Sequence, residues 1–256
     1  MKTILLAGGY AKRLWPLTKD RPKSLLRIAG KPIIEYIFDG IEKIEEIKEI
    51  YLSTNRKFET NFKDWLENYR SSKEITLVIE ETRDEKEKLG SIGALNFLID
   101  RLGLKEDLLI IGGDNLFDFD LKDLIEFYRA KKKSVVLLYD MKDKEIVKGK
   151  YGVLEMDSAF KIINSEEKPK EPNSTLISTA CYIFTKEDLA LISDYLEAGN
   201  NPDAIGFFVS WLCKRRDIYG VIHKGLWFDI GSFYDYERAN VVYGEIKKSK
   251  NTKKLF

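Results

Sequence analysis

The first half of the chain alternates short apolar runs with segments whose apolar residues recur every three or four positions. Short apolar runs are typical of buried strands, and the three-to-four spacing is typical of amphipathic helices. The runs predict strands at 3–7, 50–53, 75–79, 108–111 and 135–138. The spaced segments predict helices at 32–47, 58–69, 91–102 and 120–132. This alternation predicts an α/β fold with a mostly parallel sheet.

The second half of the chain is less regular, with several short strands close together. The pattern predicts strands near 151–156, 160–164, 177–184, 218–223 and 226–229. It predicts helices near 186–197, 203–216 and 232–247. The strands after 151 indicate a small antiparallel excursion. Because there are no repeats and no low-complexity linker, we expect one domain over 1–246 and a basic, mobile tail over 247–256.

Composition narrows the class of protein. The 256 residues carry 43 Lys and Arg against 42 Asp and Glu, and 44% are hydrophobic, which excludes global disorder. A net charge of +1 argues against a nucleic-acid partner. No apolar run approaches the roughly 20 residues that cross a bilayer, and the first apolar stretch is too short for a signal peptide. We therefore expect a cytoplasmic protein with no membrane partner, and the sequence leaves a homo-oligomer open.

The two cysteines and the single histidine indicate no special chemistry. They are too few for a disulfide framework, and a zinc site of Cys and His is improbable. We interpret Cys181, Cys213 and His223 as structural residues.

The most informative segment joins the first strand to the first helix, from Gly8 to Lys31. A connection of this length in an α/β fold is usually functional or disordered, and three prolines in or next to it argue for order. It holds seven Lys and Arg residues and one Asp. This excess favours a polyanion, and Gly8 and Gly9 let backbone N–H groups approach phosphate oxygens. A solvated basic loop is the alternative.

This segment lacks the sequence G-x-x-x-x-G-K-[ST], and Ala11 stands where G-x-G-x-x-G has its second Gly. It resembles the signature of the sugar-1-phosphate nucleotidyltransferases, or nucleoside-diphosphate-sugar pyrophosphorylases. The matching stretches are LAGGYAKRLWPLT at 6–18, RPKSLL at 21–26 and GKPII at 30–34. The family pattern is roughly LAGGxGTRLxPLT, so Ala11 and Lys12 replace a Gly and a Thr.

The resemblance extends over about residues 3–240 and implies a Rossmann-like mixed, mostly parallel sheet sandwiched by helices, with the antiparallel excursion at the sugar site. We expect a short form similar to glucose-1-phosphate thymidylyltransferase, without the C-terminal β-helix of some relatives. The family's phosphate loop and its GTAGA segment, here LGSIGA at 89–94, imply a set of nucleotide-binding residues. These are Leu6, Ala7, Gly8, Gly9, Gly90 and Gly113. For Gly90 the alternative is an ordinary helix start with Ser91 as its cap.

Two aspartates are candidate metal ligands. Asp114 ends the fourth predicted strand, at the same sheet edge as the phosphate loop, and a carboxylate beside a triphosphate needs a bridging cation such as Mg²⁺. The segment WFDIG at 227–231 resembles the family's W-x-D-x-G, which implies that Asp229 is the second ligand. Read alone, Asp114 is a turn residue and Asp229 a turn or helix cap.

The sugar site rests on the resemblance alone. EEKP at 166–169 resembles the family's E-K-P, so Glu167 would bind sugar hydroxyls and Lys168 the sugar's phosphate. Tyr-Gly-Val at 151–153 implies that Gly152 lets the backbone approach a hydroxyl. Thr179 lies where many members have Asn-x-Gly, which leaves the identity of the sugar open. An exposed turn is the alternative for 166–169.

The implied reaction is Mg²⁺-dependent transfer from a nucleoside triphosphate to a sugar 1-phosphate, with glucose 1-phosphate the commonest family substrate. Arg13 would hold the β- and γ-phosphates and Lys23 the α-phosphate, with Lys168 as the third catalytic cation. The sequence does not fix the base. The alternatives are a nucleotide-sugar sensor without turnover and a phosphocholine-type cytidylyltransferase.

Overall fold

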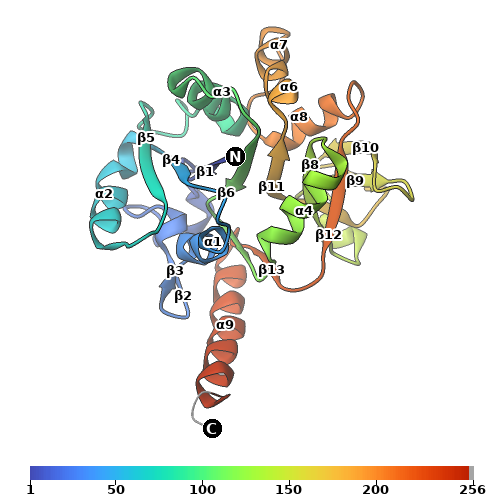
Figure 1. Cartoon of the computed structure of the whole chain (residues 1–256). Helices are drawn as coiled ribbons and strands as arrows, with labels where there is room; N and C mark the ends of the chain where they lie inside the picture. The colour runs from blue at the N-terminus through green and yellow to red at the C-terminus, as the bar shows by residue number, and fades with distance from the viewer. Residues whose placement is uncertain (254–256) are drawn as a thin grey trace.

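A nine-stranded mixed sheet lies at the centre of the molecule, which we describe from a computed structural model over residues 1–253 (Figure 1). Four neighbouring strands are parallel, in the order β6-β1-β4-β5. Their bounds are Lys2–Leu6 (β1), Glu49–Asn55 (β4), Glu74–Glu80 (β5) and Leu108–Gly112 (β6). Their carboxyl ends meet at one edge of the sheet, where ligands bind in open α/β folds.

The other half of the sheet is mixed. Strand β11 (Leu176–Phe184) runs antiparallel to β6 and to β8 (Val135–Asp140), and β12 (Tyr219–His223) pairs in parallel with β8. Strands β9 (Gly152–Met156) and β10 (Ile162–Glu167) form the antiparallel excursion. Two small ribbons are separate from this sheet. They are β2 (Arg27–Ile28) with β3 (Lys31–Pro32), and β7 (Asn115–Phe117) with β13 (Trp227–Asp229).

Helices cover both faces because the central strands are apolar on both sides. In β1, Leu5 packs with the helices of one face and Ile4 with those of the other. The first face holds α1 (Ile33–Glu42), α2 (Glu59–Asn68) and α4 (Leu121–Lys131). The second face holds α3 (Gly90–Leu102), α7 (Leu191–Glu197) and α8 (Ile205–Leu212). The remaining short elements are η1 (Lys12–Leu14), η2 (Lys23–Leu25), η3 (Arg56–Phe58), α5 (Lys144–Val147) and α6 (Lys186–Leu189).

The predicted fold class is confirmed, and the differences are at helix ends. The helix expected over 32–47 ends at Glu42, although Ile44 and Ile47 are buried in the same core as α1. The apolar spacing therefore continues into an irregular segment. The helix expected over 186–197 is two short helices, α6 and α7.

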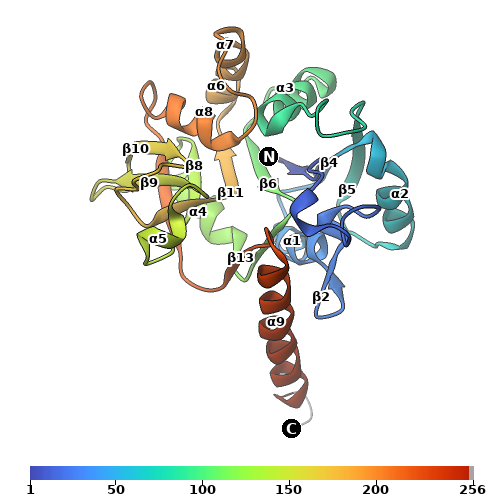
Figure 2. The ribbon, with the colours of Figure 1, turned by 180° about the vertical axis from the view of Figure 1, so that it is seen from behind.

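The last helix, α9 (Phe233–Lys253), projects from the body of the molecule (Figures 1 and 2). It runs past residue 247, where we expected a tail, and Lys247 Nζ donates to the Ala29 carbonyl at 3.2 Å. Residues 254–256 lie outside the described residues, so the mobility of this end stays a prediction. Among residues 1–253, no helix is both long and apolar enough to cross a membrane.

Near its start, α9 is fixed to the β2–β3 ribbon. The side-chain oxygen of Asn240 accepts from the Ala29 N–H at 2.9 Å, and the Tyr236 hydroxyl donates to the Arg27 carbonyl at 3.0 Å. Ala239 and Tyr243 are buried in the small core that contains Leu14 and Leu26. This contact joins the C-terminal helix to the long basic segment near the N-terminus.

Candidate functional site

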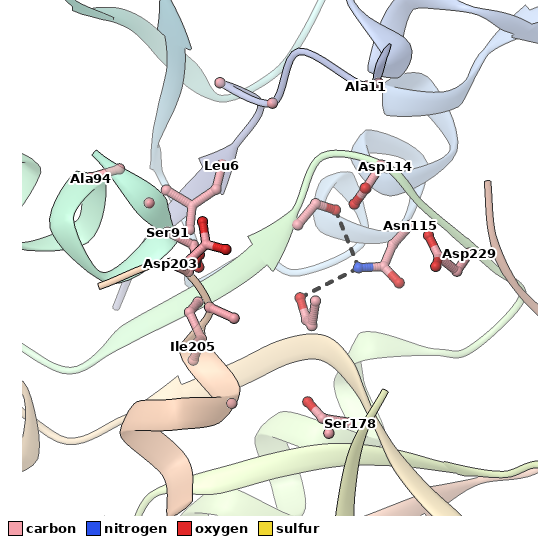
Figure 3. A pocket seen from close by; sticks show the side chains of 18 of the residues that line it. Leu6, Ala11, Ser91, Ala94, Asp114, Asn115, Ser178, Asp203, Ile205 and Asp229 are labelled. Carbon is pink, nitrogen blue, oxygen red and sulfur yellow. Dashed lines mark hydrogen bonds between the residues drawn. The ribbon is translucent and has the colours of Figure 1, made fainter. Parts of the chain in front are cut away.

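A cavity of about 640 Å³ opens at the carboxyl ends of β1, β5 and β6 (Figure 3). Its walls come from residues 6–13, which we call the phosphate loop, and from the start of α3 and strands β9 to β11. The segments 203–206 and 227–229 complete them. Ten of the predicted site residues line it. They are Leu6, Gly8, Gly9, Arg13, Gly90, Asp114, Gly152, Glu167, Thr179 and Asp229. The other four, Ala7, Lys23, Gly113 and Lys168, are not among the lining residues but lie beside them in the sequence or in space.

The phosphate loop keeps a backbone shape that usually selects glycine. Ala11 has a left-handed φ of 46°, and its carbonyl accepts a hydrogen bond from Thr18 Oγ1 at 2.8 Å before η1 begins. At Gly8, a Cβ would lie 3.0 Å from the Glu80 carboxylate. A Cβ on Gly9 would have no other heavy atom of the described residues within 4 Å. The loop therefore presents its backbone to the cavity, with Ala11 in the left-handed conformation.

Lys23 brings the two predicted metal ligands together. Its Nζ lies 2.5 Å from Asp114 Oδ2 and 3.9 Å from Asp229 Oδ1. The ribbon of β7 and β13 sets this geometry, because Asp229 pairs with Asn115, the residue after Asp114. Figure 3 shows both aspartates beside Asn115, on the opposite side of the cavity from Leu6 and Ser91.

Asn115 fixes this corner of the site. Its side-chain nitrogen donates to the carbonyls of Gly112 and Ala180, and its oxygen accepts from Trp227 Nε1 at 2.8 Å. The residue is 3% exposed, so these contacts satisfy a buried amide. The end of β6, the middle of β11 and the start of β13 are thereby held in one arrangement around the aspartates.

The charges in this corner are strongly coupled. Burial by itself lowers the pKa of Lys23, but Asp114 and Asp229 outweigh burial and raise the pKa above its ordinary value. Burial acts to raise the pKa of Asp114, but Lys23 outweighs it and lowers this pKa. For Asp229, burial raises the pKa, Lys23 offsets only part of this, and Asp114 raises it further. Lys23 is therefore charged and Asp114 ionised, while Asp229 is the more easily protonated carboxyl.

The donor set fits a divalent cation that keeps several other ligands. Two carboxylates facing one point, with a phosphate-binding loop beside them, are ordinary ligands for Mg²⁺. No group of three or more His, Cys, Asp or Glu side chains in residues 1–253 is arranged to hold a metal by itself. Phosphate oxygens and water would have to complete the shell.

Arg13 is an uncommitted cation. It is exposed in the cavity, and no ion pair or hydrogen bond of its side chain occurs among the described residues. Its guanidinium lies close to the aspartates, since it helps to lower the pKa of Asp114. A planar guanidinium at this place is free to bind two phosphate oxygens.

The predicted sugar side contains a buried carboxylate. The side chain of Glu167 is 8% exposed, and Lys168 Nζ lies 3.8 Å from its Oε1. Burial raises the pKa of Glu167, and Lys168 offsets part of this effect. A Cβ on Gly152 would lie 2.6 Å from Glu167 Oε2, and one on Gly206 would lie 1.8 Å from it. Both glycines therefore make room for this carboxylate.

Thr179 and its neighbour are already hydrogen-bonded. The Thr179 hydroxyl is buried and donates to the Leu137 carbonyl at 2.9 Å. The Ser178 hydroxyl, which is more exposed, donates to the Tyr182 hydroxyl at 2.7 Å. A contact between Thr179 and a sugar stays a prediction.

Gly90 and Gly113 have packing reasons of their own. Gly90 has φ +74°, and a Cβ there would lie 2.3 Å from the Pro202 carbonyl oxygen. A Cβ on Gly113 would lie 3.0 Å from that of Ala7. Ser91 does not cap α3, because the Asp203 carbonyl accepts from both its N–H and its hydroxyl. The start of α3 is therefore closed by the 202–203 backbone.

Sequence reasoning did not include several charged residues of the cavity among the candidate site residues. Lys12 pairs with Glu85 at 2.9 Å, and Lys88 pairs with Asp203 at 2.7 Å. Glu80, at the end of β5, is a buried carboxylate in the wall. Only Glu80 could have been found from the sequence pattern, because it is an acidic residue directly after a predicted strand. The ion pairs join loops far apart in the sequence.

The chain matches the family model described as nucleotidyl transferase over residues 2–245. A protein from Sulfolobus acidocaldarius named "Putative mannose-1-phosphate guanyltransferase" is 33% identical over 94% of this chain and 62% of its own length. A "Bifunctional protein GlmU" from Methanocaldococcus jannaschii is 30% identical over 94% of this chain and 53% of its own length. The chain thus spans a little over half the length of these curated relatives.

Solved structures of sugar nucleotidyltransferases are also similar to this chain. A crystal structure named as a putative glucose-1-phosphate thymidylyltransferase from Bacillus anthracis has a TM-score of 0.81 and 26% identity, covering 95% of each chain. A UDP-glucose pyrophosphorylase complexed with UDP-glucose has a TM-score of 0.79 and 25% identity, covering 95% of this chain and 98% of that one. These matches confirm the resemblance that the motifs indicated.

Proposed function

The chain belongs to the nucleotidyl transferase family, and we propose that it transfers a nucleoside monophosphate from a nucleoside triphosphate to a sugar 1-phosphate in a Mg²⁺-dependent reaction. The observation that carries this proposal is the group of Lys23, Asp114 and Asp229 at the rim of a cavity that also contains Arg13 and Glu167. The cations in and beside this cavity can neutralise two anionic substrates, and its carboxylates can hold a divalent cation. The products are a nucleoside-diphosphate sugar and pyrophosphate.

The reaction needs no protein nucleophile. An oxygen of the sugar phosphate attacks the α-phosphorus, and the bond from that phosphorus to the pyrophosphate oxygen breaks in line. Positioning and charge neutralisation supply most of the acceleration in phosphoryl transfer. Arg13 binds the β- and γ-phosphates and stabilises the charge that develops on the leaving pyrophosphate.

Lys23 has the α-phosphate as its target. It is held by Asp114 at 2.5 Å, and its raised pKa keeps it charged. Asp114 and Asp229 are the residues that would hold Mg²⁺. When bound, Mg²⁺ supplies electrostatic stabilisation to the phosphate oxygens.

Glu167 and Lys168 act on the acceptor. A buried carboxylate with one ion-pair partner at 3.8 Å retains free acceptor positions, which suit sugar hydroxyls. The Lys168 side chain is 50% exposed and neutralises the incoming phosphate. Glucose 1-phosphate is the first acceptor to test, since it appears in the name of the Bacillus anthracis structure. Mannose 1-phosphate is the second, from the name of the Sulfolobus protein.

The test is a pyrophosphate-release screen of five nucleoside triphosphates against several sugar 1-phosphates, with and without Mg²⁺. We expect release that depends on the acceptor and on the metal. Arg13→Ala and Asp114→Asn should each reduce turnover at least about 100-fold. Lys19→Met, an exposed lysine of the same segment, is the matched control. Near-normal release by both site variants refutes the assignments, and nucleotide binding without turnover by the wild type favours the sensor.

A further inference from the structure

Glu80 is a buried carboxylate that the proposed reaction does not use. It is 5% exposed, ends strand β5 and belongs to the cavity wall. Ser53 donates to its Oε1 at 2.7 Å, and no hydrogen bond to its Oε2 occurs among the described residues. Its carboxylate lies against Gly8, where the missing side chain leaves it room. A buried acceptor that is only partly satisfied needs a donor from the ligand.

The position of Glu80 identifies the part of the ligand that it meets. The aspartates and Lys23 occupy one side of the cavity, and Glu167 belongs to the predicted sugar side. The rest of the wall combines small or apolar residues with charged ones. The small or apolar residues include Leu6, Gly90, Ser91 and Ala94, and the charged ones are Lys12, Glu80, Glu85, Lys88 and Asp203. Figure 3 shows Leu6, Ser91 and Ala94 together, away from the aspartates.

The lysines near this wall have partners of their own, because Lys88 pairs with Asp203 and Lys12 with Glu85. A wall that presents small and apolar residues, and whose two lysines are already paired with carboxylates, suits the uncharged part of the nucleotide, which is the base. Glu80 is therefore an acceptor aimed at the edge of a base.

We propose that Glu80 selects guanine by accepting hydrogen bonds from N1–H and from the 2-amino group of the base. An ionised carboxylate can only accept hydrogen bonds. Guanine alone among the common bases presents two adjacent donors on one edge. Uracil and thymine present one N–H between two carbonyl oxygens, and adenine and cytosine present an amino group beside a ring acceptor. The inference rests on the proposed function, and it adds the identity of the base.

Hydrogen-bond donors stabilise the ionised carboxylate. Burial raises the pKa of Glu80 above its ordinary value, and the Ser53 hydroxyl offsets only part of this effect. The two donors of guanine would lower this pKa further towards its ordinary value. With a pyrimidine, the carbonyl oxygens would face a carboxylate in a buried site, which is repulsive.

The wild-type protein can be tested with inosine triphosphate, which differs from GTP only by the absent 2-amino group. We expect it to bind GTP, measured calorimetrically with Mg²⁺, at least about tenfold more tightly than ITP, dTTP or UTP. Equal affinity for GTP and ITP, or a preference for a pyrimidine nucleotide, overturns the inference.

The variant Glu80→Gln replaces one acceptor by a donor in the same shape. It should reduce the preference for GTP over ITP to near unity and shift the GTP-to-UTP ratio at least about tenfold towards UTP. The control is Glu81→Gln, because Glu81 is exposed and accepts a hydrogen bond from Arg56 Nε at 3.0 Å. An unchanged GTP-to-ITP ratio in folded Glu80→Gln, checked by its melting temperature, also overturns the inference.

Binding and turnover separate this inference from the proposed function. Tight, selective GTP binding without pyrophosphate release for any sugar 1-phosphate supports the role of Glu80 and contradicts the proposed reaction. Turnover with a different base supports the reaction and contradicts the role of Glu80.

Discussion

Lys23 connects the stability of the protein to its metal site, and Lys23→Met tests that connection. The substitution keeps most of the length of the side chain and removes the charge that lies 2.5 Å from Asp114 and 3.9 Å from Asp229. Two carboxylates then face each other, and the only cation of residues 1–253 near them is the Arg13 guanidinium. We expect the metal-free variant to be less stable than the wild type and to respond more strongly to Mg²⁺.

The magnitude follows from burial. Removing one partner of a fully buried ion pair costs about 3–5 kcal/mol. Here the side chain of Lys23 is 14% exposed, but those of Asp114 and Asp229 are 40% and 33% exposed, so solvent screens part of the repulsion. We therefore expect a loss of about 2 kcal/mol. For a chain of this size that corresponds to a fall in melting temperature of about 4–8 °C.

The assay is thermal unfolding at neutral pH with millimolar MgCl₂ or with NaCl of equal ionic strength. Mg²⁺ raises the melting temperature of any protein whose native state binds it. In Lys23→Met it also replaces the lost cation, so the Mg²⁺-induced rise should exceed that of the wild type. Adding Asp114→Asn to Lys23→Met removes the repulsion and should recover most of the metal-free stability.

Lys19→Met is the matched control, since Lys19 is an exposed lysine of the same segment. It should leave both the melting temperature and the Mg²⁺ response unchanged. An unaltered melting temperature for metal-free Lys23→Met, together with a Mg²⁺ response equal to that of the wild type, would refute the reasoning.

Three further predictions concern the sugar side and the thiols. Gly206→Ala should raise KM for the sugar phosphate about tenfold and leave KM for the nucleotide nearly unchanged, because a Cβ there would lie 1.8 Å from Glu167 Oε2. An equal change in both KM values contradicts this. Burial raises the pKa of Glu167, so the native state binds its proton more tightly than the unfolded chain does, and stability falls as pH rises through that pKa. Glu167→Gln should therefore melt higher than the wild type at about pH 7.5 and lose this advantage near pH 4, and an advantage that grows in acid would reverse the sign. Cys181 is fully buried and burial raises its pKa, so a disulfide reagent should label Cys213 alone in the native protein, and labelling of both thiols before unfolding would contradict the core position of Cys181.

Much of the fold could be predicted because the central strands are continuous apolar runs with helices between them. The meeting of Asp114 and Asp229 could also be anticipated, since Asp114 follows a strand and the resemblance to the family implies that both aspartates are metal ligands. The positions at which helices end were harder to predict. The apolar spacing carried the first predicted helix through Ile44 and Ile47, which are buried without being helical. At the other end, a lysine-rich composition suggested a tail where α9 continues.

The contacts that shape the cavity could not be derived from spacing. Gly206 makes room for Glu167 across 39 positions of sequence, and Gly8 does the same for Glu80. The ion pair of Lys12 and Glu85 joins two loops that local patterns treat separately. Such contacts depend on how distant loops pack, and a periodic pattern carries no information about that.

The docking of α9 against the β2–β3 ribbon affects the order in which the protein folds during its synthesis. Asp229 lies four residues before the start of that helix, and Lys23 lies four residues before the start of the ribbon, so the helix–ribbon contact lies next to the metal-binding residues in both segments. During synthesis, the emerging chain can complete most of the sheet while the second aspartate is still inside the ribosome. The metal-binding site, and the core that packs the basic segment against α9, are thus completed only after most of the sheet has formed.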